Sequence, residues 1–187
     1  AGEVLYQGTD MRTGSALEIY RSGVGRCGEE AVFVVNVMRS AGIPARPVYV
    51  PRWSHCDDNH AWVEVWCDGD WHYLGACEPE AVLDKGWFTN AASRAMMIGS
   101  RWYDRAMPDE KVIGKDGMNR IINLLGKYAK TRWITITVED LDGTPAAGAK
   151  VRAEVMNYGE FSPIAIMEAD KNGCISFETG FGSLLIC

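Results

Sequence analysis

The chain has 187 residues, of which 47% are hydrophobic and 24% charged, and its formal net charge is −6. This composition is typical of a folded globular protein and excludes a largely disordered chain. The net negative charge argues against a nucleic-acid or anionic-membrane surface, and no apolar run approaches the roughly 18 residues of a membrane span.

The N-terminal residues Ala1-Gly2-Glu3 do not show the charged and then apolar pattern of a signal peptide, and no methionine starts them. Either the protein is cytosolic, or the sequence begins after a removed leader or inside a longer chain, and we favour the last of these.

Two helices are expected in the first part of the chain. A short one should cover Ser15 to Arg21, and a glycine-punctuated loop, residues 22–25, then leads into a longer one. The longer helix should run from Cys27 to about Arg39. Because it is apolar nearly all round, we expect it to be a buried central helix that ends at a glycine cap, Gly42, before a proline.

Strand patterns follow this helix. Residues 45–51 show the two-residue alternation of a strand, with Arg46, Val48 and Val50 on one face. Residues 60–67 are rich in aromatic and β-branched side chains. Asp68-Gly69-Asp70 is the expected turn to an antiparallel strand at 71–74, and residues 96–98 are a further candidate strand. Residues 104–119 are expected to form a surface loop or linker.

From residue 128 onwards the pattern is all β. Strands are expected at residues 132–138, 149–156, 163–167, 173–177 and 183–186, separated by turn sequences such as Lys171-Asn172-Gly173. The pattern indicates a small β-sandwich that is shorter than the ~100 residues of an immunoglobulin-like domain. It either continues beyond Cys187 or ends at the last strand of the sandwich.

Cys27 is the strongest candidate for a reactive side chain, because it stands where the long helix begins. The first N–H groups of a helix have no partner within the helix, and the helix dipole is positive there. Both effects favour a thiolate and lower the pKa of a thiol from about 8.5. The alternative is a buried cysteine that packs as a small hydrophobic side chain.

A cysteine nucleophile needs an imidazole nearby and a third group that orients it. The chain has three histidines, and His60, which opens a strand after a polar loop, is the best candidate for the base. A structural role is expected for His72 on the return strand, and His55 in the loop is a candidate substrate contact.

The register of the hairpin determines which residue lies opposite His60 and could orient its imidazole. A two-residue turn at residues 68–69 would place His60 opposite Cys77, whereas a three-residue loop would place it opposite Glu78. Since three-residue loops with a bulge are common, Glu78 is a credible carboxylate partner of His60.

Four motifs together resemble the core of the transglutaminase-like superfamily, which includes transglutaminases, peptide N-glycanases and bacterial cysteine proteases. They are residues 25–29 (GRCGE), 42–46 (GIPAR), 60–65 (HAWVEV) and 71–74 (WHYL), in that order. The resemblance covers roughly residues 6 to 100. It implies an α+β fold with a papain-like core, in which a central helix packs on an antiparallel sheet, and a Cys-His-Asp triad.

Carried onto this sequence, the resemblance makes Cys27 the nucleophile and His60 the general base and acid. The usual aspartate of an Asp-Pro pair would fall at Gly75, counted from Trp71, where it is absent. We take Glu78, which precedes Pro79, as the substitute catalytic residue, with Asp57 and Asp58 as weaker candidates.

The C-terminal part is similar to carboxypeptidase-regulatory or immunoglobulin-like modules of extracytoplasmic bacterial proteins. This likeness rests on residues 142–145 (DGTP) and 148–151 (GAKV). The expected domains are therefore a catalytic domain at 1–127 and a β module at 128–187. The likeness implies a periplasmic, surface or secreted location and a cell-surface ligand for the module.

The favoured function is a cysteine-dependent amide hydrolase, a peptidase acting on a peptide or protein substrate, with Trp53, Trp62 and His55 as substrate contacts and no cofactor or metal. One alternative is a transglutaminase, which transfers the acyl group to an amine. Another is an inactive binding domain with a groove lined by Trp53, Trp62 and Trp87. A zinc site of Cys56, His60, Cys67 and Cys77 is a weaker alternative.

Overall fold

The computed structural model describes residues 4–8, 14–103 and 112–187. The chain divides into two compact units, of which the first comprises Ala1–Tyr49 and His60–Thr89, and the second comprises Val50–Asn59 and Asn90–Cys187. The chain thus leaves the first unit for ten residues and returns to it at His60. This division differs from the boundary expected at residues 127 and 128, which stays a prediction.

The first unit begins with a parallel pair of short strands, β1 (Leu5–Tyr6) and β2 (Val24–Gly25), with helix α1 (Ala16–Ser22) between them in sequence. Ser15 caps α1, since its hydroxyl accepts a hydrogen bond from the Glu18 amide at 3.3 Å and the Glu18 carboxylate accepts from the Ser15 amide at 2.7 Å. The expected short helix is confirmed.

Helix α2 (Cys27–Ser40) follows β2 and ends as its sequence predicts. Gly42 has a φ of +79°, and the amide of Ile43 donates to the Met38 carbonyl at 3.0 Å, which together form a Schellman cap. The helix is not buried all round, however. It buries Ala31, Val34 and Val35 on one face, and Val37 on the other side is 47% exposed.

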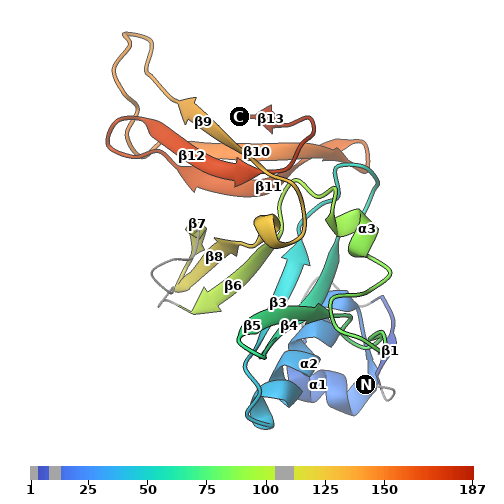
Figure 1. Ribbon diagram of the computed structural model, residues 1–187. Coiled ribbons are helices and arrows are strands. Elements are labelled where there is room, and N and C mark those ends of the chain that lie inside the picture. Colours follow the sequence, from blue (N-terminus) through green and yellow to red (C-terminus); the bar gives the residue numbers. More distant parts are fainter. Residues whose placement is uncertain (1–3, 9–13, 104–111) are drawn as a thin grey trace. The chain divides into compact units, whose positions relative to one another are not determined.

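The buried face of α2 packs against a sheet in which β4 (His60–Cys67) lies between β3 (Ala45–Val50) and β5 (Asp70–Leu74) (Figure 1). Val63 and Val65 of β4 join the helix side chains in one hydrophobic core. Strands β4 and β5 are antiparallel, and Cys67 pairs with Asp70. Asp68 and Gly69, with φ values of +51° and +86°, therefore form a two-residue turn.

The second unit contains the short helix α3 (Thr89–Ala92) and the strands β6 (Gly99–Tyr103), β7 (Val112–Asp116) and β8 (Asn119–Asn123). These strands are antiparallel in the order β6-β8-β7. Two expectations were wrong here. Residues 96–98 precede β6 and are not part of it, although their side chains are buried. Residues 112–119 belong to a hairpin, while 104–111 lie outside the described residues.

After a 3-10 turn, η1 (Leu125–Lys127), five strands complete the second unit: β9 (Arg132–Thr137), β10 (Lys150–Asn157), β11 (Glu160–Glu168), β12 (Cys174–Thr179) and β13 (Leu185–Ile186). They form a three-stranded sheet, β11-β10-β13, and a two-stranded sheet, β12-β9. Side chains from both sheets share one core that includes Val155, Ile164 and Phe177.

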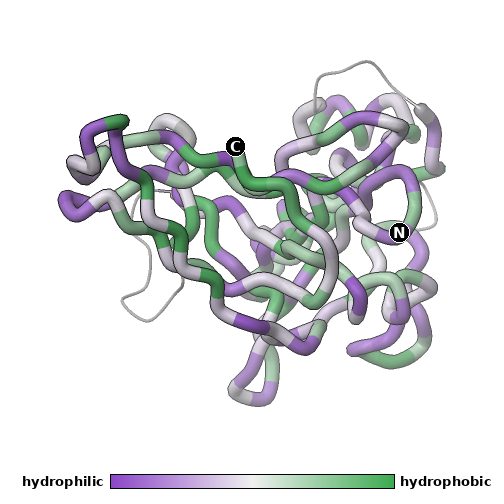
Figure 2. Tube along the Cα trace, turned by 90° about the horizontal axis from the view of Figure 1, so that it is seen from above, coloured by the Kyte–Doolittle hydropathy of each residue, from purple (hydrophilic) through white to green (hydrophobic). Residues whose placement is uncertain are grey.

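The strand pattern expected for the C-terminal part is therefore present, with bounds shifted by a few residues. Figure 2 shows the end of the chain as strongly hydrophobic, in keeping with Leu184 to Cys187. Cys187 exchanges two backbone hydrogen bonds with Arg152 of β10, at 2.8 and 3.0 Å. None of the helices in the described part of the chain is long and apolar enough to cross a membrane.

Candidate active site

Cys27 is the first residue of α2, and its side chain is half-buried. The chain that enters the helix is held in place by the neighbouring Glu29, which is buried. Its carboxylate accepts hydrogen bonds from the amides of Gly14 and Arg26, each at 3.0 Å. The structure thus places the thiol at the positive end of a helix, as the sequence predicts, where the thiolate is favoured.

His60 is the first residue of β4 and is 7% exposed. Its imidazole is packed among aromatic rings, with centroid distances of 4.5 Å to Trp87, 4.9 Å to Phe88 and 5.9 Å to Trp62. Such packing restricts rotation of the ring and holds the histidine in one orientation. His60 therefore lies at a strand end with a fixed ring, as a catalytic base requires.

Glu78 lies in the segment that follows β5, and its carboxylate is engaged by Trp87. The indole N–H of Trp87 donates to Oε1 of Glu78 at 2.7 Å, and the same indole packs on the His60 ring. Trp87, which is 61% exposed, thus contacts both residues that were predicted to act with Cys27.

Glu30, in the first turn of α2, is an unexpected part of this region. It is 5% exposed, and burial together with the negative charge of Glu78 raises its pKa from 4.5 to about 7. The same surroundings act on Cys77, since burial and the charges of Glu30 and Glu78 raise the pKa of that thiol to about 11. Cys77 is therefore a neutral thiol at physiological pH.

These interactions connect the three predicted catalytic positions within the first unit. Cys27 lies one turn before Glu30, the Glu30 carboxyl group feels the charge of Glu78, and Trp87 joins Glu78 to His60. The structure therefore relates the first turn of α2 to the start of β4 through Glu78 and Trp87, while the catalytic roles of Cys27, His60 and Glu78 stay predictions.

The sequence argument for Glu78 assumed the wrong hairpin register. The observed register pairs Val63 with Leu74 and has a two-residue turn, so its extension would place His60 opposite Cys77. The turn is short because Asp68 and Gly69 adopt the positive φ values that a tight hairpin requires. Glu78 reaches the site through a loop and its contact with Trp87, not through strand pairing.

The position of the usual aspartate, Gly75, has no room for a side chain. A Cβ atom on Gly75 would lie 2.8 Å from the backbone oxygen of Glu78, which is closer than real Cβ contacts. Asp57 and Asp58, the weaker candidates, lie in the second unit. Oδ1 of Asp57 accepts from the Tyr158 amide, and Oδ1 of Asp58 accepts from the Asn59 amide at 2.8 Å.

The predicted substrate contacts are in different places. Trp62 is fully buried in the first unit, and Trp53 is 3% exposed in the second, so neither offers an indole face to a ligand in this structure. His55, also in the second unit, lines a pocket. His72 is on β5, where Nδ1 lies 2.6 Å from Oδ2 of Asp84, an interaction that raises the pKa of His72.

The zinc alternative finds no support. In the described ranges, which include all the cysteines and histidines, no group of three or more metal-binding side chains is close enough to hold a metal ion. The six cysteines are all free thiols in the structure.

Sequence reasoning missed Glu30 and Phe88. The sequence gives only indirect indications of their roles. Glu30 falls one helical turn after the candidate nucleophile, and Phe88 is next to Trp87, which was expected to line a groove. Nothing in the local sequence indicates that Phe88 packs against His60, because that contact joins residues 28 positions apart.

The comparisons with known proteins give a family match in the N-terminal part of the chain. Residues 2–76 match the family model of the transglutaminase-like superfamily. The matched range includes the helix of Cys27 and the hairpin that His60 begins. No curated protein is significantly similar to the chain. At a coarse level, this match suggests a cysteine-dependent hydrolase or acyltransferase.

Proposed function

We propose that the protein is a cysteine-dependent amide hydrolase, a peptidase that acts through an acyl-enzyme on Cys27. The observation that carries the proposal is the position of Cys27 as the first residue of α2, in a segment that matches the transglutaminase-like superfamily. The contacts of Trp87 with Glu78 and His60, and the effect of the Glu78 charge on Glu30 of α2, support it.

The reaction has two steps. The Cys27 thiolate attacks the amide carbonyl carbon, first-turn amides stabilise the oxyanion, and the C–N bond breaks as His60 gives its proton to the leaving amine. In the second step, His60 takes a proton from water, whose oxygen attacks the thioester. The C–S bond then breaks and releases a carboxylic acid and the Cys27 thiol.

Cleavage of a peptide library by the wild type and by Cys27→Ala tests the nucleophile, with Cys77→Ala as the matched control. We expect cleavage to be lost in Cys27→Ala and retained in Cys77→Ala, whose thiol is neutral. Retained cleavage in Cys27→Ala would overturn the assignment. Site-resolved iodoacetamide labelling at neutral pH adds an independent measurement, because Cys27 should react faster than Cys77.

The acyltransferase alternative shares the acyl-enzyme and differs in the acceptor, which is an amine in place of water. Incorporation of a fluorescent amine into a glutamine-containing protein, measured beside peptide hydrolysis, separates the two activities. A catalytically inactive binding domain would show neither activity and no fast labelling of Cys27.

The role of Glu78 as the third catalytic residue rests on its contact with Trp87 and its replacement of an aspartate that Gly75 cannot provide. Glu78→Gln keeps an acceptor for the indole and removes the charge, whereas Asp57→Asn and Asp58→Asn alter the weaker candidates. We expect only Glu78→Gln to lower kcat substantially, by about 100-fold or more, and to change the pH profile.

For the C-terminal strands we propose an immunoglobulin-like module that binds a cell-surface ligand, in a protein that works outside the cytoplasm. The strand pattern and the core that the two sheets share support this proposal. Localisation of the tagged protein in fractionated cells tests it, and recovery from the cytoplasm alone would contradict it.

A further inference from the structure

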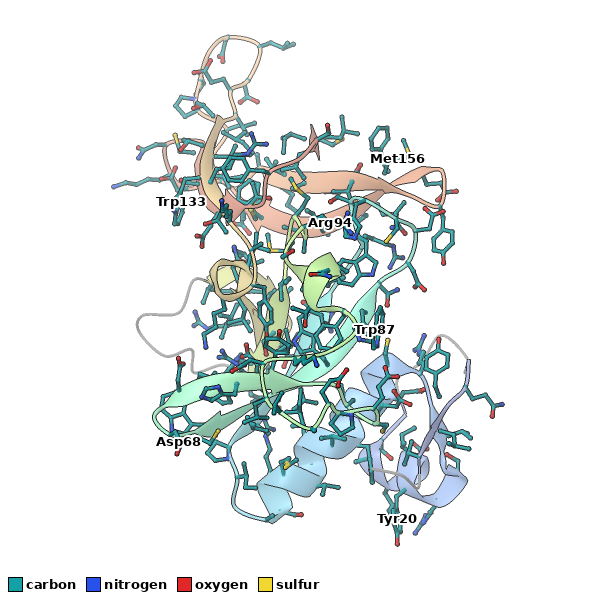
Figure 3. All side chains as sticks on the ribbon, turned by 45° about the vertical axis from the view of Figure 1, so that its right-hand side comes forward. Tyr20, Asp68, Trp87, Arg94, Trp133 and Met156 are labelled. Atoms are coloured by element: carbon teal, nitrogen blue, oxygen red, sulfur yellow. The ribbon has the colours of Figure 1, made fainter. Side chains whose placement is uncertain are left out.

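The second unit contains a pocket of about 750 Å³ that the proposed catalytic chemistry does not use. Its lining comes from five parts of that unit: the loop after β3, the segment after α3, the turn after η1, strand β10 and the turn after β12. Figure 3 labels two of its residues, Arg94 after α3 and Met156 near the end of β10.

The pocket is lined by positively charged side chains. Arg94 and Lys130 line it, together with His55, and no carboxylate side chain is among its lining residues. Within the described ranges, neither cationic side chain forms a salt bridge. Two cations that face a pocket without a carboxylate attract an anion to it.

His55 lines the pocket near Arg94. Its Nδ1 is buried and has no hydrogen-bond partner in the part of the chain that the structure describes. Burial and the nearby charge of Arg94 lower the pKa of His55, which indicates that the imidazole and the guanidinium lie close to each other. Because Nδ1 has almost no accessible surface, a ligand in the pocket meets the rest of the imidazole ring and not this nitrogen.

Much of the remaining lining is apolar or aromatic, with Tyr128, Val155, Met156 and Phe181 among its residues. The turn that carries Phe181 is fixed, because Thr179 donates to the Met96 carbonyl at 2.7 Å and Arg132 donates to the Gly182 carbonyl at 2.9 Å. Only glycine fits at position 180, where a Cβ would lie within 2.2 Å of the Ala95 oxygen.

The loop that carries His55 is also held in place. The Asn157 amide donates to the carbonyls of Trp53 and Cys56 at 3.0 and 3.1 Å, and the Ser54 hydroxyl donates to the Arg94 carbonyl at 3.4 Å. The loop of His55 and the turn of Phe181 are therefore held in place without a ligand, which is typical of a binding site.

We propose that this pocket binds a carboxylate attached to an apolar group, with Arg94 and Lys130 on the carboxylate and Tyr128 and Phe181 on the apolar part. A peptide that ends in a hydrophobic residue and a small aromatic carboxylic acid both have this chemistry. The site is independent of the catalytic proposal and remains testable in a Cys27→Ala background.

Isothermal titration of the full-length Cys27→Ala protein tests the site with three probes: acetyl-Gly-Leu-Phe as the free acid, the same peptide as its amide, and 3-phenylpropanoate. We expect the free acid to bind at least about 10-fold more tightly than the amide, because a charge-assisted contact is lost in the amide. Binding of 3-phenylpropanoate alone would support the pocket with a small-molecule ligand. Equal binding of acid and amide, or binding of no probe, would overturn it.

Variants locate the binding in the pocket. Arg94→Gln and Lys130→Gln should each weaken binding of the probe that binds by about 10-fold. Lys171→Gln, at an exposed lysine in the turn before β12, is the matched control and should bind as the parent does. Circular dichroism establishes that each variant is folded, and unchanged affinity in folded Arg94→Gln and Lys130→Gln would overturn the assignment.

Discussion

Glu30 is a carboxyl group whose protonation is coupled to folding. Its pKa rises from 4.5 to about 7 in the folded chain, so folding favours the protonated form. The stability from this group is fully present below pH 4.5 and is lost as the pH rises to about 7. We expect urea denaturation at pH 8 to give Glu30→Gln a free energy of unfolding roughly 1–3 kcal/mol higher than that of the wild type. At pH 4.5 the two free energies should be nearly equal.

Glu80→Gln, at an exposed carboxylate in the segment that contains Glu78, is the control for this comparison. Glu80→Gln should leave the difference between the free energies of unfolding at pH 8 and pH 4.5 as it is in the wild type. If Glu30→Gln lowered stability equally at both pH values, the carboxyl group would act through its packing and not through its titration.

Arg46 and Glu64 form an ion pair in the interior of the first unit. Nε of Arg46 lies 2.5 Å from Oε2 of Glu64, both side chains are 2% exposed, and the guanidinium lies 4.2 Å from the Trp71 ring centre. Removing one partner leaves a buried charge, so we expect Glu64→Leu to lower the free energy of unfolding by about 3–5 kcal/mol.

The double variant Arg46→Met/Glu64→Leu removes both charges and keeps similar volumes. It should recover most of the loss, because replacement of a buried pair by apolar groups is often neutral. Urea denaturation of the wild type, both single variants and the double variant measures the coupling. A double variant as unstable as the sum of the singles would contradict the ion-pair argument.

At the scale of elements, one side chain of β10 organises a loop that lies about a hundred positions earlier in the sequence. Asn157 is 2% exposed, and its amide nitrogen donates to the carbonyls of Trp53, Cys56 and Asp58. Asn157→Asp would place a carboxylate against these three carbonyl oxygens. We expect a loss of about 2–4 kcal/mol in the free energy of unfolding and faster amide hydrogen exchange in Val50–Asn59.

Asn172→Asp, at an exposed turn position before β12, should leave both measurements unchanged. Retained exchange protection of the loop in Asn157→Asp would show that other contacts hold the loop. Since the loop carries His55, the same variant should also weaken binding of the carboxylate probe to the pocket.

Elements with strong local patterns could be predicted from the sequence. The strand at His60–Cys67 has the expected bounds, because its aromatic and β-branched side chains are bracketed by polar turns. The hairpin at Val112–Asn123 was missed, since its glycines and charged residues are typical of a loop and its pairing with β6 depends on residues that come earlier in the chain. The turn length at Asp68 was also ambiguous, because the sequence allows both registers.

The candidate site shows the same limit. Cys27 and His60 are placed as the motifs predict, because a helix start and a strand start are local features. The contacts of Trp87 with His60 and Glu78, and the burial of Glu30, depend on how distant segments pack. Sequence patterns carry no direct signal for such contacts.

For the whole molecule, the titrating groups predict a stability maximum on the acidic side of neutrality. Glu30 and His72 have raised pKa values, so their contributions are lost as the pH rises above 4.5 and 6.5 respectively. Asp142 and Asp170 have lowered pKa values, because of hydrogen bonds from Thr144 and from Cys174, so their contributions are lost as the pH falls below 3.8.

We therefore expect the midpoint of urea unfolding to be highest near pH 5 and to fall toward both pH 3 and pH 8, in line with proton linkage at about these pKa values. Measurement of the midpoint at these three values by tryptophan fluorescence checks the expectation. A midpoint that rises steadily from pH 5 to pH 8 would contradict it.

The close approach of the Glu78 carbonyl to Gly75 has a consequence for the evolution of the site. As long as the segment after β5 keeps this path, mutation of Gly75 cannot restore an aspartate without moving the backbone that carries Glu78. An aspartate at position 75 of this chain therefore requires a second, coordinated change in the path of the segment that carries Glu78.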